Sequence, residues 1–90
     1  MFDWDDNNAG HIARHNISTS EAEEVLLDRA RMLVPGKRAE SGESRHVAIG
    51  STESGRVLAV VFTRRASRIR VVTAREAGDS ERRRYRRQRR

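Results

Sequence analysis

The fold is decided by a stretch in the second half of the chain, RHVAIGSTESGRVLAVVFTRRASRIRVVTAR, residues 45–75. Its apolar residues are mostly β-branched and alternate with other residues, which is typical of strands that bury one face. The alternation predicts three strands, at residues 45–50, 56–64 and 68–75. The connections STESG and RAS between them are short, and short connections favour an antiparallel meander.

Side chains of a strand alternate between the two faces of its sheet, so each predicted strand divides into two sets. The bulkier apolar set predicts the core face and consists of Val47, Ile49, Leu58, Val60, Phe62, Ile69 and Val71. The opposite set is expected to form a shallow face with small residues in the middle and basic residues at its edge. It consists of His46, Ala48, Val57, Ala59, Val61, Thr63, Arg68, Arg70, Val72 and Ala74. An ordinary one-sided sheet with a polar outer face fits the same pattern.

The residues before this stretch predict two helices. The first is short and covers DDNNAGHIARH, residues 5–15, with an acidic N-cap. The second begins at a capping box of Ser18 and Glu21, and its apolar stripe continues to Leu33 before a Pro-Gly pair stops it. The opening MFDW is expected to be a short strand or anchor, and the residues from Ala77 onward a C-terminal helix.

Together these elements predict an α+β fold. It has a small antiparallel sheet, made of a three-stranded meander plus a short N-terminal strand, with two N-terminal helices packed on one face and a C-terminal helix. Ninety residues fit one domain, expected at residues 1–85, followed by a basic tail at residues 86–90. The chain has no cysteine, which excludes disulfides and thiolate metal sites. No apolar run approaches the roughly 20 residues of a membrane span, and the acidic N-terminus lacks signal-peptide features, so we expect a cytoplasmic protein without a membrane partner.

The net charge of +6 is distributed unevenly along the chain. Residues 1–28 hold seven acidic residues against one arginine, whereas residues 29–75 hold eleven basic residues against three acidic ones. The last nine residues hold seven arginines and no acid. A basic middle and a basic end indicate a polyanionic partner such as a nucleic acid, although a solubilising end explains the last segment equally well.

Between Phe2 and Tyr85 the chain contains six sequence blocks in this order: FDWD, RHNIS, RHVAIG, GRVLAVVFTRR, RIRVVTAREA and ERRRY. In these blocks the chain resembles the BrnT family of bacterial type II toxins. The resemblance implies a fold like that of the RelE toxins and metal-independent cleavage of RNA without a cofactor. The chain departs from the family at Asn8, where lysine is common, at His11, where asparagine is common, and at Thr19, where an aromatic residue is usual.

The resemblance also implies a co-encoded antitoxin of the ribbon-helix-helix type, which binds the toxin and represses their shared operon. Ribbon-helix-helix proteins dimerise through paired strands, so we expect a 2:2 heterotetramer with two-fold symmetry. Two other functions remain open at this point: a non-catalytic nucleic-acid-binding module, and a catalytically decayed toxin that persists as the partner of its antitoxin.

Metal-free cleavage of RNA uses the substrate's own 2′-hydroxyl as the nucleophile, and the protein supplies a base, an acid and cations that stabilise the phosphorane. Arginines at the ends of neighbouring strands suit the cationic role because guanidinium groups match phosphate oxygens in pairs. The catalytic candidates are His15, Arg64, Arg75, Glu81 and Tyr85, and the RNA-binding candidates are Arg68, Arg70 and His46.

Several candidates also have a purely structural interpretation. His15 suits the C-terminal end of a helix, where it binds the last carbonyls. Glu81 suits a salt bridge to a neighbouring arginine, and Tyr85, on the same helical face, suits a half-buried position. His11 and His15 are spaced as half of a metal site, but no third ligand is evident in the sequence, so no metal site is expected.

Overall fold

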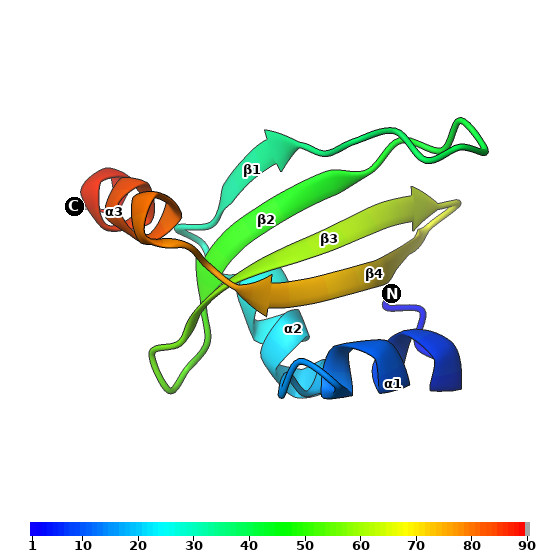
Figure 1. The fold of residues 1–90 in the computed structure, drawn as a ribbon, viewed down its shortest axis with the longest axis horizontal. Coiled ribbons are helices and arrows are strands. Elements are labelled where there is room, and N and C mark those ends of the chain that lie inside the picture. Colours follow the sequence, from blue (N-terminus) through cyan, green and yellow to red (C-terminus); the bar gives the residue numbers. More distant parts are fainter. Residues whose placement is uncertain (90) are drawn as a thin grey trace.

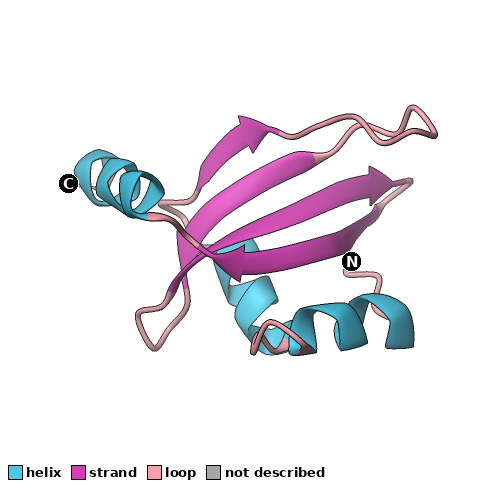
Figure 2. Ribbon diagram, in the orientation of Figure 1, coloured by secondary structure: helices cyan, strands magenta, loops and turns pink. Residues whose placement is uncertain are grey.

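The computed structural model describes residues 1–89, and over this range the chain forms three helices and one four-stranded antiparallel sheet (Figures 1 and 2). The elements are α1 (Asp6–Ala13), α2 (Thr19–Leu27), β1 (Met32–Pro35), β2 (His46–Ser51), β3 (Val57–Arg65), β4 (Arg68–Glu76) and α3 (Asp79–Gln88). The strands lie in the order β1-β2-β3-β4, so each one pairs with its neighbour in sequence. The predicted α+β class and the antiparallel meander are confirmed.

Both N-terminal helices begin at reciprocal caps. The backbone N–H of Glu21 donates to Ser18 Oγ at 3.1 Å, and the backbone N–H of Ser18 donates to Glu21 Oε1 at 3.0 Å, which confirms the predicted capping box. In α1 the side chain of Asp5 accepts from the backbone of Asn8, whose own side chain accepts from the Asp5 N–H. The caps satisfy N–H groups that have no partner inside the helix.

The fourth strand differs from the one expected. The N-terminal segment makes an isolated parallel bridge between Phe2 and Ile69, whereas β1 is built from residues expected at the end of the second helix. Leu33, assigned to the helical stripe, instead pairs with Ala48 of β2. The run Met-Leu-Val is short and apolar, and a short apolar run is compatible with either a helix or a strand.

The helix α2 ends early because of Asp28. Its carboxylate accepts hydrogen bonds from the backbone N–H of Ala30 at 2.9 Å and of Ser51 at 2.8 Å. Asp28 itself has an extended backbone, with φ −65° and ψ 120°. The side chain therefore holds the end of α2 against the end of β2, and the chain enters the sheet at Met32. The helix ends well before the Pro-Gly pair that was expected to stop it.

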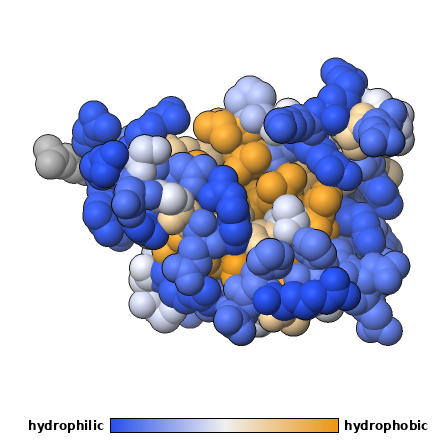
Figure 3. Space-filling view, viewed as in Figure 1, coloured by the Kyte–Doolittle hydropathy of each residue, from blue (hydrophilic) through white to orange (hydrophobic). Residues whose placement is uncertain are grey.

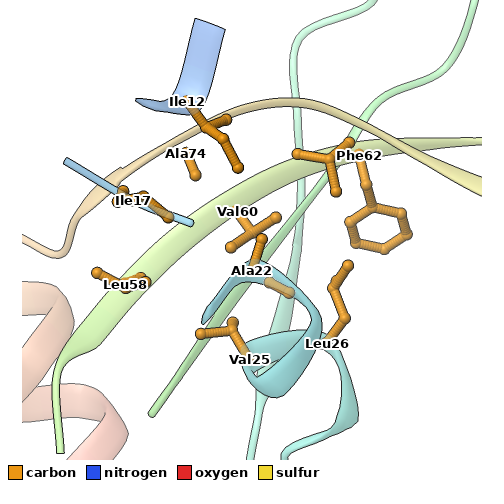
Figure 4. Close-up of a cluster of buried hydrophobic side chains, with 11 residues drawn as sticks. Ile12, Ile17, Ala22, Val25, Leu26, Leu58, Val60, Phe62 and Ala74 are labelled. Carbon is orange, nitrogen blue, oxygen red and sulfur yellow. The ribbon is translucent and has the colours of Figure 1, made fainter. Parts of the chain in front are cut away.

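One face of the sheet packs against α1 and α2, and this contact forms the main core (Figure 4). The predicted core residues of β3 and β4 lie here, and α2 supplies the stripe that covers them. The buried members of this cluster are Ile12, Ile17, Ala22, Val25, Leu26, Ala48, Leu58, Val60, Phe62, Val71 and Ala74.

The predicted faces of β2 are exchanged. Ala48 faces the two N-terminal helices, while Ile49 packs on the opposite side with Ala59 and with Tyr85 of α3. The sheet is thus covered on both sides, with α3 over one end of the second face. Small residues suit the α2 side because the helix approaches closely there, and the bulkier Ile49 fills the space under α3.

A β-bulge in the last hairpin sets the faces of β4. Val61 pairs with Thr73 but Phe62 pairs with Val71, so Val72 has no opposite residue. Beyond the bulge the alternation shifts by one residue. Ala74, expected on the basic face, is therefore buried in the main core.

We define the open face as the side of the sheet turned away from α1 and α2. Val47 and Val61 lie half-buried on it, and Figure 3 shows an apolar patch in its middle that is bordered by hydrophilic residues. The helix α3, drawn in orange and red in Figure 1, covers one end and leaves the rest accessible.

The C-terminal helix continues past the expected domain boundary. It extends to Gln88, so residues 86–88 of the predicted tail are helical, and the last expected tail residue, Arg90, lies outside the described residues. Among residues 1–89 no helix has the length and apolarity needed to cross a bilayer.

Replacing Gly50 with alanine is expected to destabilise the fold by about 1–3 kcal/mol, because the site is already filled. An added Cβ meets Asp28 Oδ2 and the carbonyl oxygen of Val25, each at 3.1 Å. Gly10→Ala is the matched control, since no atom lies within 4 Å of its Cβ and alanine favours a helix. Thermal unfolding should show a lower melting temperature for the first variant and a higher one for the second, and a Gly50→Ala protein as stable as the parent contradicts the close approach.

Candidate functional site

A groove of about 270 Å³ lies between α1, β4 and the loop that precedes β2. It is polar and mostly basic, and its single acid is Glu43. The lining residues are Asn7, Asn8, His11, Glu43, Arg45, Arg65, Arg70, Val71 and Val72.

Asn8 fastens α1 to the sheet at one wall of the groove. Its side chain is buried, and Nδ2 donates to the carbonyl oxygens of Asp3 at 2.9 Å and Val71 at 3.0 Å. Its Oδ1 accepts from the Asp5 N–H at 2.8 Å. Because both N–H groups of the amide are already used, Asn8 positions the helix and has no donor left for a ligand.

One turn further along α1, the imidazole of His11 reaches β4. His11 Nε2 lies 2.9 Å from Thr73 Oγ1. The bulge at Val72 directs Thr73 to this position, and within residues 1–89 no hydrogen bond engages the other ring nitrogen. The threonine therefore fixes the ring orientation and leaves Nδ1 available for a proton transfer.

The loop before β2 supplies the opposite wall. Thr63 is buried on β3 and its hydroxyl donates to the carbonyl oxygen of Ser44 at 2.9 Å, which holds the loop against the sheet. Glu43 and Arg65 form a salt bridge at 3.1 Å. The Nε of Arg45 is buried and makes no hydrogen bond within the described residues, so an anionic ligand in the groove has an unused donor close by.

Arg70 is held in place by two carboxylates. It lies 2.9 Å from Asp5 and 3.6 Å from Asp3, and its side chain is only 17% exposed. The backbone hydrogen bond from Asn8, together with the nearby Arg70 guanidinium, holds the pKa of Asp5 below its ordinary value. Arg70 is thus a rigid cation whose charge is partly balanced before any ligand binds.

The groove brings together an imidazole and three guanidinium groups, from Arg45, Arg65 and Arg70. Guanidinium groups bind phosphate oxygens in pairs and remain charged at any working pH. An imidazole can accept a proton at one ring nitrogen and donate one at the other. This combination suits a phosphodiester as the ligand.

A family model described as "Ribonuclease toxin, BrnT, of type II toxin-antitoxin system" matches residues 4–81 of the 90. The chain belongs to the BrnT family. Its members are ribonuclease toxins of type II toxin-antitoxin systems, which act on RNA and pair with an antitoxin. No functionally curated protein matches the sequence.

Glu81, expected as a general base in this BrnT chain, forms a two-pronged salt bridge with Arg75. The oxygen-to-nitrogen distances are 2.7 and 2.9 Å. The Arg75 hydrogen bonds, followed by that of the Gly78 N–H, lower the pKa of Glu81 to about 2. The pair stabilises the fold fully above the unfolded carboxyl pKa, and this contribution is lost as the pH falls toward about 2. Glu81 is therefore a weak proton acceptor, in agreement with its structural interpretation.

Tyr85 lies in the interior and not in the groove. It is 2% exposed, and its hydroxyl donates to Asp28 Oδ2 at 2.5 Å. Burial, reinforced by the Asp28 carboxylate, raises the pKa of Tyr85 to about 12. Although burial opposes ionisation of Asp28, the hydrogen bonds from Tyr85, Ser51 and Ala30 hold the pKa of Asp28 below its ordinary value. Tyr85 anchors α3 to the body of the domain.

Arg64 and Arg75 do not meet at one rim, contrary to expectation. In the antiparallel pair β3·β4, Arg64 is opposite Ile69 while Arg75 is opposite Ala59. Arg75 is six positions after Ile69 on β4, or about 20 Å along the strand. Ends of consecutive antiparallel strands lie at opposite ends of a sheet, so the two arginines cannot contact the same phosphate.

His46 and Arg64 lie on the α-helical side of the sheet, and not on the basic face. The His46 ring lies 5.5 Å from that of Phe62, a buried member of the main core. Both polar side chains border a hollow of about 280 Å³ together with Phe62 and Leu33. They belong to a surface distinct from the groove.

The remaining candidates lie near the groove or in it. Arg70 lines it, while Arg68 is exposed at the β3–β4 hairpin opposite Arg65. His15 is exposed beyond the end of α1, with its ring 5.4 Å from that of His11. Over residues 1–89 no three histidine, aspartate or glutamate side chains converge in a metal-binding arrangement.

His11, Arg45 and Arg65 line the groove but were not among the site residues predicted from the sequence. The first had been considered as a functional residue only as half of a metal site with His15, on the basis of their spacing. No signal marked the two arginines, because their convergence depends on a long loop and on a hairpin end that meet only in the folded chain.

Proposed function

We propose that the protein cleaves RNA in the groove by metal-independent attack of the 2′-hydroxyl on the adjacent phosphate, and thereby inhibits translation. The observation that supports this most directly is the groove itself, which combines His11 with Arg45, Arg65 and Arg70. Membership of a ribonuclease toxin family supplies the substrate class.

In the proposed reaction the 2′-oxygen forms a bond to phosphorus as the bond from phosphorus to the 5′-oxygen breaks. His11 accepts the proton of the 2′-hydroxyl through its free ring nitrogen, and the departing 5′-oxygen takes a proton from the site or from water. Arg45 and Arg65 stabilise the charge of the phosphorane, and Arg70, held by Asp5, orients the strand. The products are a 2′,3′-cyclic phosphate and a 5′-hydroxyl end.

Purified protein incubated with total RNA in excess EDTA is expected to cleave it, because the proposed groups need no metal. An RNA with a 2′-deoxy substitution at each cleavage position should resist, since it lacks the nucleophile. Complete inhibition by EDTA contradicts the proposal. Intact RNA that shifts in a gel instead supports a non-catalytic binding module.

We further propose that the antitoxin is of the ribbon-helix-helix type and forms a 2:2 assembly with the toxin, covering the open face of the sheet, with its basic edge, and α3. The distribution of charge supports this: basic residues are concentrated in residues 29–75 and in the last nine residues, and such a basic surface, if uncovered, binds cellular RNA continuously. Light scattering of the co-expressed pair tests the stoichiometry, and an RNA competition assay tests whether inhibition is competitive. A complex that still binds RNA in the groove places the antitoxin elsewhere.

A further inference from the structure

The two edges of the sheet differ in how they are covered. Along β4, Phe2 forms a bridge with Ile69, and Asn8 donates to the Val71 carbonyl, so other parts of the chain occupy that edge. At the other end of the sheet order, β1 pairs with β2 and, within residues 1–89, with no other strand. Figure 1 shows β1 at the outer border of the molecule.

An uncovered edge strand presents backbone N–H and C=O groups that are ready to pair with another strand. In β1 the central Leu33 is also 53% exposed, so a large apolar side chain is accessible at this edge. Pro35 at the end of β1 lacks an N–H and limits the length of any pairing. The edge is therefore short, apolar and free.

Three hollows border β1. The largest two measure about 410 and 470 Å³, beside Leu33 and beside Met32 respectively, and the third measures about 280 Å³. Apolar walls from Leu33, Val34 and Phe62 face two of them. Spaces of this kind on either side of an edge strand suit alternating side chains of an added strand.

The charge around these hollows is of one sign. Their basic lining residues are Arg38, Arg45, His46, Arg64, Arg84 and Arg87, and no acid lines any of the three. Over residues 1–89, Arg38, Arg64 and Arg84 form no salt bridge. This unpaired positive charge favours an anionic partner.

We propose that the β1 edge is the docking site for an extended, acidic segment of the antitoxin, which adds a strand to the sheet and places apolar side chains beside Leu33. This rests on the assignment of the chain to a toxin-antitoxin pair. A second copy of the chain fits poorly, because two such edges bring like charges together. RNA fits poorly as well, because its backbone offers few donors to the carbonyl groups of β1.

The proposal accounts for Arg64 and His46, which the groove leaves unused. It also makes the antitoxin contact continuous with α3, because Arg84 and Arg87 line the hollow beside Met32. Main-chain pairing supplies affinity and the side-chain hollows supply selectivity.

The first test compares amide hydrogen exchange of the parent toxin alone with that of the toxin bound to its co-encoded antitoxin. We expect exchange at the outward-facing amide of Leu33 to slow by at least about tenfold on binding, because the alternation that follows from the Gly36–Arg45 hydrogen bond turns the Val34 amide toward β2. Unchanged exchange there overturns the proposal. Protection of the Leu33 amide by an RNA oligonucleotide, or in a toxin that light scattering shows to self-associate, also overturns it and assigns the edge to that partner.

The second test compares two matched variants. Leu33→Asp is expected to weaken antitoxin binding by at least about tenfold, because it places a negative charge where the acidic segment docks. Leu27→Asp is the control, since Leu27 is similarly exposed, at 66%, but lies on α2 beside the acids Glu24 and Glu53. Equal weakening by both variants contradicts the site.

RNA cleavage by free Leu33→Asp should equal that of the parent. If neither protein cleaves RNA while the antitoxin still protects β1, the proposed catalytic function fails and the docking site stands. If both cleave RNA and β1 stays unprotected, the docking site fails and the proposed catalytic function stands.

Discussion

Replacing His11 with alanine is expected to lower RNA cleavage by about 10²–10⁴-fold while RNA binding stays within a few fold of the parent. The imidazole is the group in the groove that can accept a proton, and its Nε2 lies 2.9 Å from Thr73 Oγ1, which fixes its orientation. The arginines that hold the phosphate are untouched, so binding persists. Single-turnover cleavage and a separate binding assay with a 2′-deoxy RNA measure the two effects.

Two variants sharpen this test. His15→Ala removes the neighbouring exposed imidazole, whose ring lies 5.4 Å from that of His11, and is expected to cleave like the parent. His11→Asn keeps a polar contact to Thr73 but cannot accept a proton, so it should lose cleavage as His11→Ala does. Full activity in His11→Asn shows that the side chain orients the substrate and that the proton goes elsewhere.

Local sequence signals predicted the elements that local interactions determine. The capping box at Ser18 and the alternation in β3 were both confirmed, because each depends on residues close together in sequence. The end of α2 was missed, because it depends on Asp28 reaching Ser51, 23 residues later. The face assignment of β2 failed for a related reason, since only the packing of α3 makes the side with Ile49 a second core.

The candidate site shows the same limit. Composition and alternation indicated a polyanionic partner and named Arg70 as a candidate, and Arg70 lies in the wall of the groove. The sequence prediction paired Arg64 with Arg75 by their shared position at strand ends, but antiparallel strands end at opposite sides of a sheet. The bulge at Val72 and the loop that carries Arg45 leave no mark in the hydrophobic pattern, and together they determine which side chains line the groove.

Residues in the family blocks can stabilise the fold as well as take part in the chemistry. The block ERRRY contains Glu81 and Tyr85, yet both side chains hold α3 against the domain, through Arg75 and Asp28 respectively. Their helical spacing places them on one face, and that face points inward. A motif shared across a family is therefore compatible with a structural role, and variants must separate the two roles.

Replacing Asp28 with alanine is expected to be the most destabilising of these changes, at about 3–5 kcal/mol. The carboxylate accepts from the Tyr85 hydroxyl and from the backbone N–H groups of Ser51 and Ala30, and its removal leaves these donors without partners inside the domain. A loss of this size is a large part of the roughly 5–15 kcal/mol that stabilises a typical domain. Thermal unfolding should show the melting temperature fall by on the order of 15 °C or more.

Tyr85→Phe separates the structural role of this anchor from a catalytic one. It removes one hydrogen bond and keeps the ring, so the cost should be about 1–2 kcal/mol, and the backbone donors still satisfy Asp28. Because the hydroxyl is buried away from the groove, RNA cleavage measured well below the melting temperature should stay within about threefold of the parent. A stable Tyr85→Phe protein that loses cleavage by about 100-fold or more shows instead that the hydroxyl reaches the substrate, which requires α3 to move when RNA binds.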